Sequence, residues 1–473
     1  MKRHRVDLCV IGAGSGGLSV AAGASQMGAS VVLVERDRMG GDCLNVGCVP
    51  SKALIAAAGA AESARGAGRF GVRVAPPEID FAAVHDHVHG VIAAIAPHDS
   101  VERFEALGVT VIQEHGRFAG PRTVVAGAHE IEARRFVIAT GSRPAAPPIP
   151  GLDEVAYLTN ETVFERTRLP SPLIVVGGGP IGLELAQAHR RLGAEVTVLE
   201  MFAALGKDDP ELAGIVTARL RQEGVVLREG VGVTGVSAAG DGVAVEIEDG
   251  GRVERLAAAE ILVAAGRQPN IDDLGLEEAG IERNRAGVVV DDRLRTTNRR
   301  VFAAGDAAGK FQFTHVAAYH AGIIIRNALF RIPAKADDRA VPWVTYTDPE
   351  LAHVGMTEAV ARERAGDIRV LRFPFAENDR AWAERATEGL VKVIASKKGK
   401  VLGASIVGTH AGELIQTWIL PVAQGMNIKH VAGLILPYPT LGEASKRAAG
   451  SFYAPTLFGP RVRRVVRLLA RLG

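Results

Sequence analysis

A repeated alternation of apolar segments and glycine-rich turns gives the first indication of how this chain folds. Val6–Ile11 is apolar apart from Asp7, which predicts a buried strand. A glycine-rich turn follows, and the Ala-rich stretch after it, to about Met27, predicts a helix. Ser30–Val34 predicts a second strand, which ends directly before Glu35. This order of strand, turn, helix, strand and acid is typical of a parallel sheet that binds a dinucleotide.

The same order recurs in the middle of the chain. Leu173–Val176 predicts a strand, Leu183–Leu192 a helix, and Glu195–Leu199 a strand that ends at Glu200. In both copies the acid lies 23 residues after the first glycine of the turn. One such turn is a weak signal, but two copies with matched surroundings predict two dinucleotide sites. The turn glycines are Gly12, Gly14 and Gly17 in the first copy, and Gly177, Gly179 and Gly182 in the second.

Each part of this motif has a physical role at a dinucleotide. The first glycine allows the tight turn, the second lets the pyrophosphate approach the backbone, and the third lets the helix pack on the strand. Glu35 and Glu200 are predicted to accept hydrogen bonds from a ribose, and two such sites imply FAD and a nicotinamide. Glu200 repels a 2′-phosphate and Met201–Ala203 holds no arginine, so NADH is favoured over NADPH. The alternative is that Lys207 or Arg191 binds the phosphate.

Length and composition limit the class of protein. The 473 residues exceed what one core normally supports, so several domains are expected. The net charge of +2 gives no indication of nucleic-acid binding. No apolar run reaches the length needed to span a bilayer. The basic start, Met1–Arg5, precedes a short apolar stretch that contains Asp7, which predicts a first strand rather than a signal peptide, and hence a cytoplasmic protein.

Two of the three cysteines lie close together, just after the first dinucleotide motif. Cys43 and Cys48 are separated by four residues. In a reducing compartment such a pair indicates catalysis or metal binding rather than a structural disulfide. Val49–Lys52 opens an Ala-rich helical stretch, whose N-terminus would lower a thiol pKa. Cys9, in the first strand, is predicted to be a buried small residue. The pair beside a dinucleotide motif therefore predicts electron transfer between a flavin and a dithiol.

Three further runs complete the pattern: Ile138-Ala139-Thr140-Gly141, Gly266-Arg267-Gln268-Pro269-Asn270 and Ala304-Gly305-Asp306. With the cysteine run and the two glycine motifs, their order and spacing resemble those of the flavoprotein disulfide reductases, which include dihydrolipoamide dehydrogenase, glutathione reductase and mercuric reductase. The resemblance covers nearly the whole chain. It implies that Asp306 binds the ribityl chain of FAD. The cofactor-binding residues that it implies in these runs are Thr140, Gly141, Gly266, Gly305 and Asp306.

The resemblance also implies a domain plan of the α/β class, with two Rossmann-like domains for FAD and NAD and a C-terminal α/β dimerisation domain. The flavin domain would span residues 1–149 and 268–338, the nicotinamide domain 150–267, and the interface domain 339–473. Alternating apolar runs at Leu390–Ala395 and Val401–Val407 predict strands in the last domain, and Gly412–Ala423 predicts a helix. The implied assembly is a homodimer, in which the C-terminal motif completes the active site of the other subunit.

The chemistry that the resemblance implies passes two electrons from NADH through FAD to a Cys43–Cys48 disulfide. Cys48 is expected nearest the flavin, and Cys43 is expected to engage the substrate as a thiolate. Lys52 matches the family's lysine beside flavin N5, and Glu184 matches the ion-pair partner of that lysine. Thiol–disulfide exchange of this kind requires low thiol pKa values.

The C-terminal motif departs from most disulfide reductases, which carry His-Pro-Thr-x-x-Glu. There the histidine is the general acid/base and the glutamate orients it. Here Tyr438 replaces the histidine, while Glu443 remains. A tyrosine pKa of about 10, against about 6.5 for histidine, makes Tyr438 a poor base at pH 7 but a suitable acid or ligand. This argues against efficient oxidation of dihydrolipoamide, and the alternative is that Tyr438 only packs beside the disulfide.

Mercuric reductases resemble this chain at the same place, because they too carry a tyrosine there. They also present a vicinal cysteine pair near the C-terminus, which this sequence lacks. The favoured function is therefore an NADH:disulfide oxidoreductase that acts on a small-molecule or protein-bound disulfide. A second hypothesis is a reductase of Hg(II) or another soft metal ion that uses Cys43, Cys48 and Tyr438. A third is a redox-sensing or membrane-docked flavoprotein, against which the intact dithiol, Lys52 and Glu184 argue.

Two smaller patterns remain. His85 and His89 would share one face of a helix, as a metal-binding pair does. We nevertheless predict a solvated helix face there, and no metal site. The tail Pro460–Leu472 is basic and amphipathic, which fits contact with an anionic membrane surface or a partner. The favoured interpretation of the tail is a terminal helix that packs on its own dimer.

Overall fold

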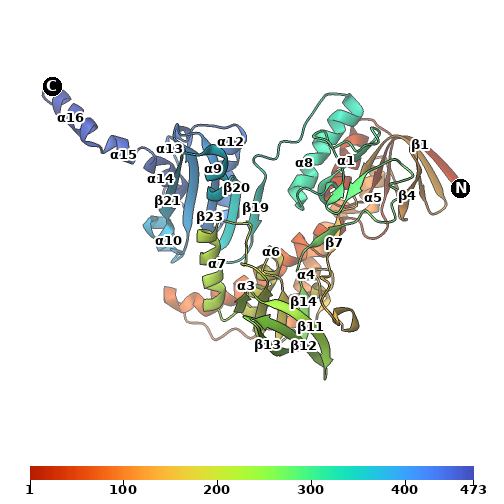
Figure 1. The fold of residues 1–473 in the computed structure, drawn as a ribbon, viewed down its shortest axis with the longest axis horizontal. Helices are drawn as coiled ribbons and strands as arrows, with labels where there is room; N and C mark the ends of the chain where they lie inside the picture. The colour runs from red at the N-terminus through yellow and green to blue at the C-terminus, as the bar shows by residue number, and fades with distance from the viewer. Residues whose placement is uncertain (473) are drawn as a thin grey trace. The chain divides into compact units, whose positions relative to one another are not determined.

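The computed structural model describes residues 1–472, and Gly473, the last residue of the predicted interface domain, lies outside the described part. The chain groups into two compact units. The first comprises residues 1–177, 188–197 and 232–336, and the second comprises 178–187, 198–231 and 337–473. Both contain helices and strands (Figure 1), which confirms the predicted α/β class. The four-part domain plan stays a prediction.

The first unit is built on a seven-stranded sheet around the predicted N-terminal strand. β1 (Lys2–Ile11) pairs in parallel with β2 (Val31–Val34) on one side and with β6 (His129–Ile138) on the other. The turn after β1 leads into α1 (Ser15–Gln26), so strand, helix and strand lie where the apolar pattern predicts them. β18 (Val301–Ala303) also pairs in parallel with β6. The remaining strands are β3 (Val109–Ile112), β4 (Gly116–Gly120) and β5 (Thr123–Ala126), in the order β3-β2-β1-β6-β5-β4.

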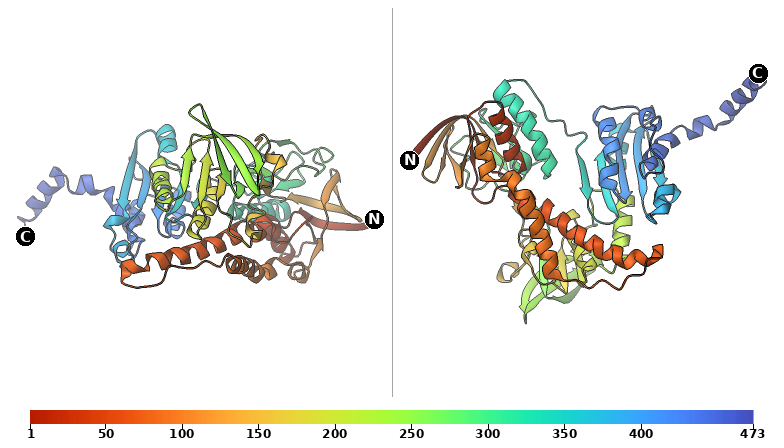
Figure 2. Two further views of the ribbon diagram at one scale, coloured as in Figure 1. Left: turned by 90° about the horizontal axis from the view of Figure 1, so that it is seen from below. Right: turned by 180° about the vertical axis from the view of Figure 1, so that it is seen from behind.

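Both faces of this sheet are buried. Leu8 and Val10 point into one apolar core, while Cys9 and Ile11 point into another, as expected for successive residues of a strand. Cys9 is completely buried, which confirms its predicted position. α8 (Thr314–Ile325) packs against α1, and α3 (Cys48–Gly66) lies beside α4 (Phe81–Ile95) (Figure 2). The first glycine turn and the cysteine run are thus attached to one rigid core.

The second dinucleotide motif repeats the local structure of the first. β8 (Leu173–Val176), α6 (Pro180–Arg191) and β9 (Val196–Glu200) follow each other as predicted. β8 pairs in parallel with β14 (Glu260–Val263), and the sheet order is β10-β9-β8-β14, with β10 at Val226–Glu229. A separate antiparallel sheet contains β11 (Gly232–Ala239), β12 (Gly242–Asp249) and β13 (Arg252–Ala258).

The C-terminal part of the second unit contains a five-stranded antiparallel sheet. β22 (Leu390–Ser396) and β23 (Val401–Gly408) confirm the two predicted strands. The single helix predicted over Gly412–Ala423 is wrong in detail, because α11 (Ala411–Leu414) and α12 (Gln416–Ala423) are separate helices. The apolar pattern runs on across their junction and therefore gives no signal for it. The other strands are β19 (Pro342–Thr345), β20 (Glu350–Gly355) and β21 (Ile368–Pro374), in the order β19-β20-β23-β22-β21.

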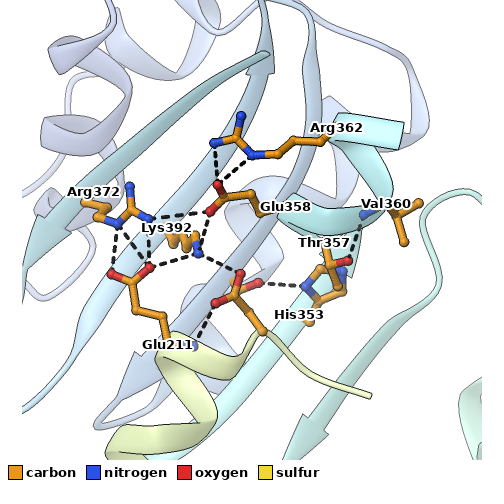
Figure 3. A network of polar contacts seen from close by, with 10 residues as sticks. Glu211, His353, Thr357, Glu358, Val360, Arg362, Arg372 and Lys392 are labelled. Carbon is orange, nitrogen blue, oxygen red and sulfur yellow. Dashed lines mark hydrogen bonds and ion pairs between the residues drawn. The ribbon is translucent and has the colours of Figure 1, made fainter. Parts of the chain in front are cut away.

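An ion-pair network around the buried Lys392 joins α7 (Pro210–Gln222), α9 (Glu358–Ala365) and β22 within the second unit (Figure 3). The Lys392 side chain is 4% exposed, and its Nζ lies 2.7 Å from Asp209. The same Nζ lies 2.8 Å from Glu211 and 2.8 Å from Glu358. Asp209 also accepts a hydrogen bond from the backbone amide of Glu211 and so caps α7. The Lys392 cluster comprises three cations and three carboxylates: Lys392, Arg362, Arg372, Asp209, Glu211 and Glu358.

The predicted tail helix is present as α16 (Pro460–Leu469). It projects away from the sheet of its own unit (Figure 1). Val465, Val466 and Leu469 are each more than half exposed. The amphipathic face is therefore uncovered within the described chain, and its partner stays a prediction.

One helical stretch differs from the prediction that no apolar segment is long enough to span a bilayer. Gly41–Phe70 is long and apolar enough to cross a bilayer by length and composition alone. It joins α2 (Gly41–Asn45), α3 and a 3₁₀ turn, and many of its residues are alanines. A core helix passes the same test, so one such stretch is weak evidence for a membrane span.

Candidate functional site

The first glycine turn has the geometry that a dinucleotide requires. Gly12 has φ +101°, and a Cβ there would lie 2.4 Å from the carbonyl oxygen of Ala139. A Cβ on Gly17 would lie 1.8 Å from the carbonyl oxygen of Gly12. Only glycine fits at these two positions. The amide of Ala13 donates to Glu35 (2.5 Å), so the predicted ribose-binding carboxylate also fixes the turn.

The second copy reproduces these contacts at equivalent positions. Gly177 has φ +115°, and a Cβ there would lie 2.5 Å from the carbonyl oxygen of Ala264. The amide of Gly178 donates to one oxygen of Glu200 (2.6 Å), and that of Phe202 donates to the other (2.8 Å). In the first copy the amide of the residue two after Glu35 donates to it in the same way (2.9 Å). The repeat inferred from spacing is therefore a repeat of geometry.

The residues at both turns fit dinucleotides. α1 begins after Gly14, and within the described chain no side chain caps its N-terminus, so its first amides are left for a phosphate. Arg191 is buried, which argues against its binding a 2′-phosphate. The preference for NADH stays a prediction.

The two cysteines lie on adjacent helices of the first unit. Cys43 lies in α2, and Cys48 is the first residue of α3, so the predicted helix N-terminus is found at the thiol itself. Both are free thiols in this structure, and Cys48 is exposed. Cys48 Sγ lies 3.5 Å from Thr314 Oγ1, a contact that the sequence analysis missed.

The two thiols have opposite pKa shifts. A hydrogen bond from Cys43, opposed by burial but reinforced by Thr314 and the charge of Lys52, lowers the pKa of Cys48 to about 6. The same hydrogen bond and burial raise the pKa of Cys43. The pair therefore holds one proton near neutral pH, on Cys43, and presents a thiolate at Cys48.

An arginine outside the predicted set links the dithiol region to Asp306. Arg267 donates to Asp42 (2.9 Å), the residue before Cys43. It also donates through Nε to the hydroxyl of Ser142 (2.8 Å), which in turn donates to Asp306 (2.5 Å). Burial raises the pKa of Asp306. This series of hydrogen bonds positions the Asp306 carboxylate, which is predicted to bind the ribityl group.

The two predicted domain crossings are bound to each other. β7 (Ser142–Pro144) pairs with β15 (Arg267–Pro269), and the two strands begin directly after Gly141 and Gly266. Thr140 Oγ1 donates to the carbonyl oxygen of Asn270 (2.6 Å), and the Asn270 side chain donates to the carbonyl oxygen of Thr140 (3.1 Å). Gly305 donates its amide to His320 (3.1 Å). The crossings thus form one rigid joint.

Lys52 and Glu184, the predicted ion pair, belong to different units: Lys52 to the first and Glu184 to the second. Lys52 Nζ donates to Ser51 Oγ (3.4 Å) in the first unit. Glu184 is buried in the second unit and accepts a hydrogen bond from the amide of Tyr346 (2.9 Å). The pairing of Lys52 with Glu184 stays a prediction.

Tyr438 of the C-terminal motif contacts a carboxylate that the sequence analysis did not predict. The Tyr438 side chain donates its hydroxyl to Asp379 (2.8 Å), and Tyr438 is 68% exposed. This hydrogen bond and the negative charge of Asp379 raise the pKa of Tyr438. Glu443 begins α14 (Glu443–Ser451) and adds a smaller effect in the same direction. Tyr438 is therefore held as a proton donor and is still less suited to act as a base than a free tyrosine.

Comparison with known proteins defines the class. The profile of the pyridine nucleotide-disulphide oxidoreductases matches residues 6–321, and the profile of their dimerisation domain matches residues 341–449. The chain belongs to the pyridine nucleotide-disulphide oxidoreductase family, and is an oxidoreductase of a family that uses FAD and NAD(P)H. The dimerisation domain supports the predicted homodimer.

The relatives of this chain include enzymes with different activities. The chain is 38% identical over 455 residues to a mercuric reductase from Streptomyces lividans, across 94% of this chain and 96% of that protein. It is 36% identical over 465 residues to a dihydrolipoyl dehydrogenase from Thermus scotoductus, across 94% and 97%. The solved structure of RclA from Escherichia coli, a HOCl-induced flavoprotein disulfide reductase, has a TM-score of 0.85 at 29% identity and covers 94% of this chain and 99% of that one.

Proposed function

We propose that the protein is an NADH-dependent reductase in which Cys43 and Cys48 pass electrons to a disulfide acceptor. The observation that carries this proposal is the hydrogen-bonded pair of free thiols on two adjacent helices, with Cys43 in α2 and Cys48 at the start of α3. Bound FAD supplies the hydride acceptor for the nicotinamide and the two electrons for the dithiol. The glycine turns, Glu35 and Glu200 bind and orient the two dinucleotides.

The dithiol then completes a balanced exchange. Cys43 transfers its proton to Cys48 and attacks the acceptor disulfide, which releases one thiolate and leaves a mixed disulfide on Cys43. Cys48 then passes that proton to the thiolate released in the first step and attacks Cys43, which restores the Cys43–Cys48 disulfide and releases the second thiolate, so the products are one thiol and one thiolate. The pKa of Cys48, at about 6, favours this second attack at neutral pH.

A soft metal ion is the second candidate acceptor. The Tyr438 phenol donates to Asp379, so its oxygen is not a ready base for substrate thiols. Two thiol sulfurs suit Hg(II) or a similar ion. Mercuric reductases are among the relatives, and a copper(II) complex of RclA is among the similar structures, at a TM-score of 0.84.

One experiment separates the two candidates. NADH oxidation by the FAD-loaded protein is measured with lipoamide, glutathione disulfide and Hg(II) in parallel. We expect turnover with a disulfide, loss of that turnover in Cys43→Ser, and normal turnover in the matched control Cys9→Ala. Turnover with Hg(II) alone would assign the protein to metal reduction, and full disulfide activity in Cys43→Ser would exclude the proposed exchange.

The role of Tyr438 is tested by two substitutions. Tyr438→His restores the family's usual base and should raise the rate at which dihydrolipoamide reduces NAD⁺, measured in the reverse direction. Tyr438→Phe removes the hydroxyl and should leave disulfide reduction nearly unchanged if Tyr438 only packs there. A larger loss with Hg(II) than with disulfides in Tyr438→Phe would favour a ligand role.

A further inference from the structure

We propose that His85, His89 and Glu165 form a binding site for a divalent transition-metal ion of the zinc class. The sequence predicts a solvated helix face here, because no cysteine lies near the two histidines to strengthen a metal site. In the structure one ligand atom from each of these three residues lies within 4.8 Å of the other two. All three belong to the first unit.

The geometry requires little rearrangement. His85 and His89 lie on α4 one turn apart, and their ring centroids are 4.2 Å apart. His89 Nε2 lies 3.8 Å from Glu165 Oε2. Ligand atoms about 2.0–2.1 Å from a tetrahedral zinc ion are about 3.3 Å from one another. The Glu165 side chain is 54% exposed, so it is free to close the remaining distance.

Two polar neighbours bear on how the histidines would bind a metal. Asp86 lies 3.1 Å from His85 Nδ1, where an outer-shell carboxylate supports a metal-bound imidazole and leaves Nε2 for the ion. His89 Nε2 lies 3.1 Å from the carbonyl oxygen of Phe164, and a metal ion bound at Nε2 would replace this contact. The neighbouring cation, Arg166, is paired with Glu260 (3.1 Å).

The donor set defines the class of ion. Two imidazoles and one carboxylate suit Zn(II), Co(II) or Ni(II), and three protein ligands leave a fourth position for water. His85 also borders a small cavity of about 10 Å³, whose lining includes Phe81, Val84 and Val88. These apolar neighbours limit water on one side of the site. The ligands differ in chemistry from the two sulfurs of Cys43 and Cys48, which select softer ions.

Zinc titration of the FAD-loaded protein tests the site. The protein is first oxidised, so that no Cys43 or Cys48 thiolate competes, and Zn(II) binding is followed by isothermal titration calorimetry. We expect one zinc ion per chain, and a rise in the unfolding temperature when zinc is added. Loss of an outer-shell partner commonly weakens metal affinity ~10–100-fold. Loss of a ligand in His85→Ala, His89→Ala or Glu165→Gln should therefore weaken zinc binding by at least ~10-fold.

His87→Ala is the matched control, since His87 is an exposed histidine on the same helix between the two ligands. It should bind zinc as the wild type does. Absence of stoichiometric binding, or equal affinity in Glu165→Gln and the wild type, would overturn the proposal. Glu165→Gln decides the question even if a histidine variant fails to fold, because this side chain lies largely in solvent. Binding lost equally in His87→Ala would indicate only adventitious histidine binding.

Discussion

Removal of the Lys392 charge should destabilise the second unit severely. In Lys392→Met a cation that is 4% exposed disappears, while the three carboxylates around it remain. Glu211 and Glu358 keep partners, because Arg372 lies 2.8 Å from Glu211 and Arg362 lies 2.5 Å from Glu358. Both are also partly exposed to water. The uncompensated charge is therefore chiefly that of Asp209.

The expected loss of unfolding free energy follows from the partners that each carboxylate keeps. An isolated charge left behind when one partner of a buried ion pair is removed costs about 3–5 kcal/mol. Asp209 still accepts one backbone hydrogen bond, so we expect the lower end of this range, about 3 kcal/mol. For a unit of this size that corresponds to a fall in the unfolding temperature of roughly 6–12 °C.

The assay uses the natural tryptophans, because Trp343, Trp382 and Trp418 all lie in the second unit. Urea unfolding followed by tryptophan fluorescence therefore reports on the unit that contains the Lys392 cluster. Lys397→Met is the matched control, since Lys397 is 67% exposed and pairs with Asp367 at the surface. Such surface pairs contribute at most about 1 kcal/mol. Asp209→Asn combined with Lys392→Met should recover part of the loss.

A stability of Lys392→Met within 1 kcal/mol of the wild type would refute the reasoning, as would equal effects of Lys392→Met and Lys397→Met. Either result would mean that water or the flanking arginines neutralise Asp209 without Lys392. Failure of the double variant to recover stability would show that the loss comes from packing and not from the orphaned charge.

Four other expectations are open to measurement. The pH dependence of the alkylation rate at Cys48 in the reduced protein should have its midpoint near the Cys48 pKa of about 6. Cys43→Ala should move this midpoint towards about 8.5, because the main hydrogen bond that stabilises the thiolate is lost. An unchanged midpoint would contradict that cause. Arg372, followed by Lys392, lowers the pKa of Glu211 to about 2, so this contribution to stability is complete above about pH 4.3 and is lost as the pH falls towards 2. Arg372→Met should therefore shift acid unfolding, followed by tryptophan fluorescence, to higher pH. Glu200→Ala should reduce the NADH/NADPH ratio of kcat/KM about 10-fold or more, and an unchanged ratio would place the discriminating group elsewhere. Deletion of α16 should weaken the homodimer in analytical ultracentrifugation, because the favoured contact of this helix is with its own dimer, whereas co-sedimentation of the intact protein with phosphatidylserine vesicles that is lost on deletion would indicate the membrane role instead.

The sequence predicts those parts of the molecule that depend on neighbouring residues. The strands around both glycine turns were predictable, because apolar runs and turn glycines act locally. The helix start at Cys48 was predictable for the same reason. Even the contacts of Glu35 and Glu200 follow from a spacing that each copy repeats.

The missed groups are brought together only by the fold. Arg267 and Asp42 are 225 positions apart, and neither motif shows that they meet. Asp379 lies 59 positions before Tyr438 and changes the expected chemistry of that tyrosine by accepting a hydrogen bond from its hydroxyl. Glu165 reaches the face of α4 from another segment. Side-chain partners of this kind depend on how loops pack, and periodicity contains no information about that packing.

The paired backbone contacts of Glu35 and Glu200 limit how this fold can change its choice of nucleotide. Each carboxylate braces its glycine turn and is also the group predicted to accept hydrogen bonds from a ribose. The predicted selectivity and the local stiffness therefore depend on one side chain. A substitution at Glu200 that admits an extra phosphate also gives up two hydrogen bonds, each a net stabilisation of about 1 kcal/mol. A single change at Glu200 should therefore lower the NADH/NADPH ratio together with the stability of the turn, and full exchange of the nicotinamide cofactor needs a second change that supports the turn.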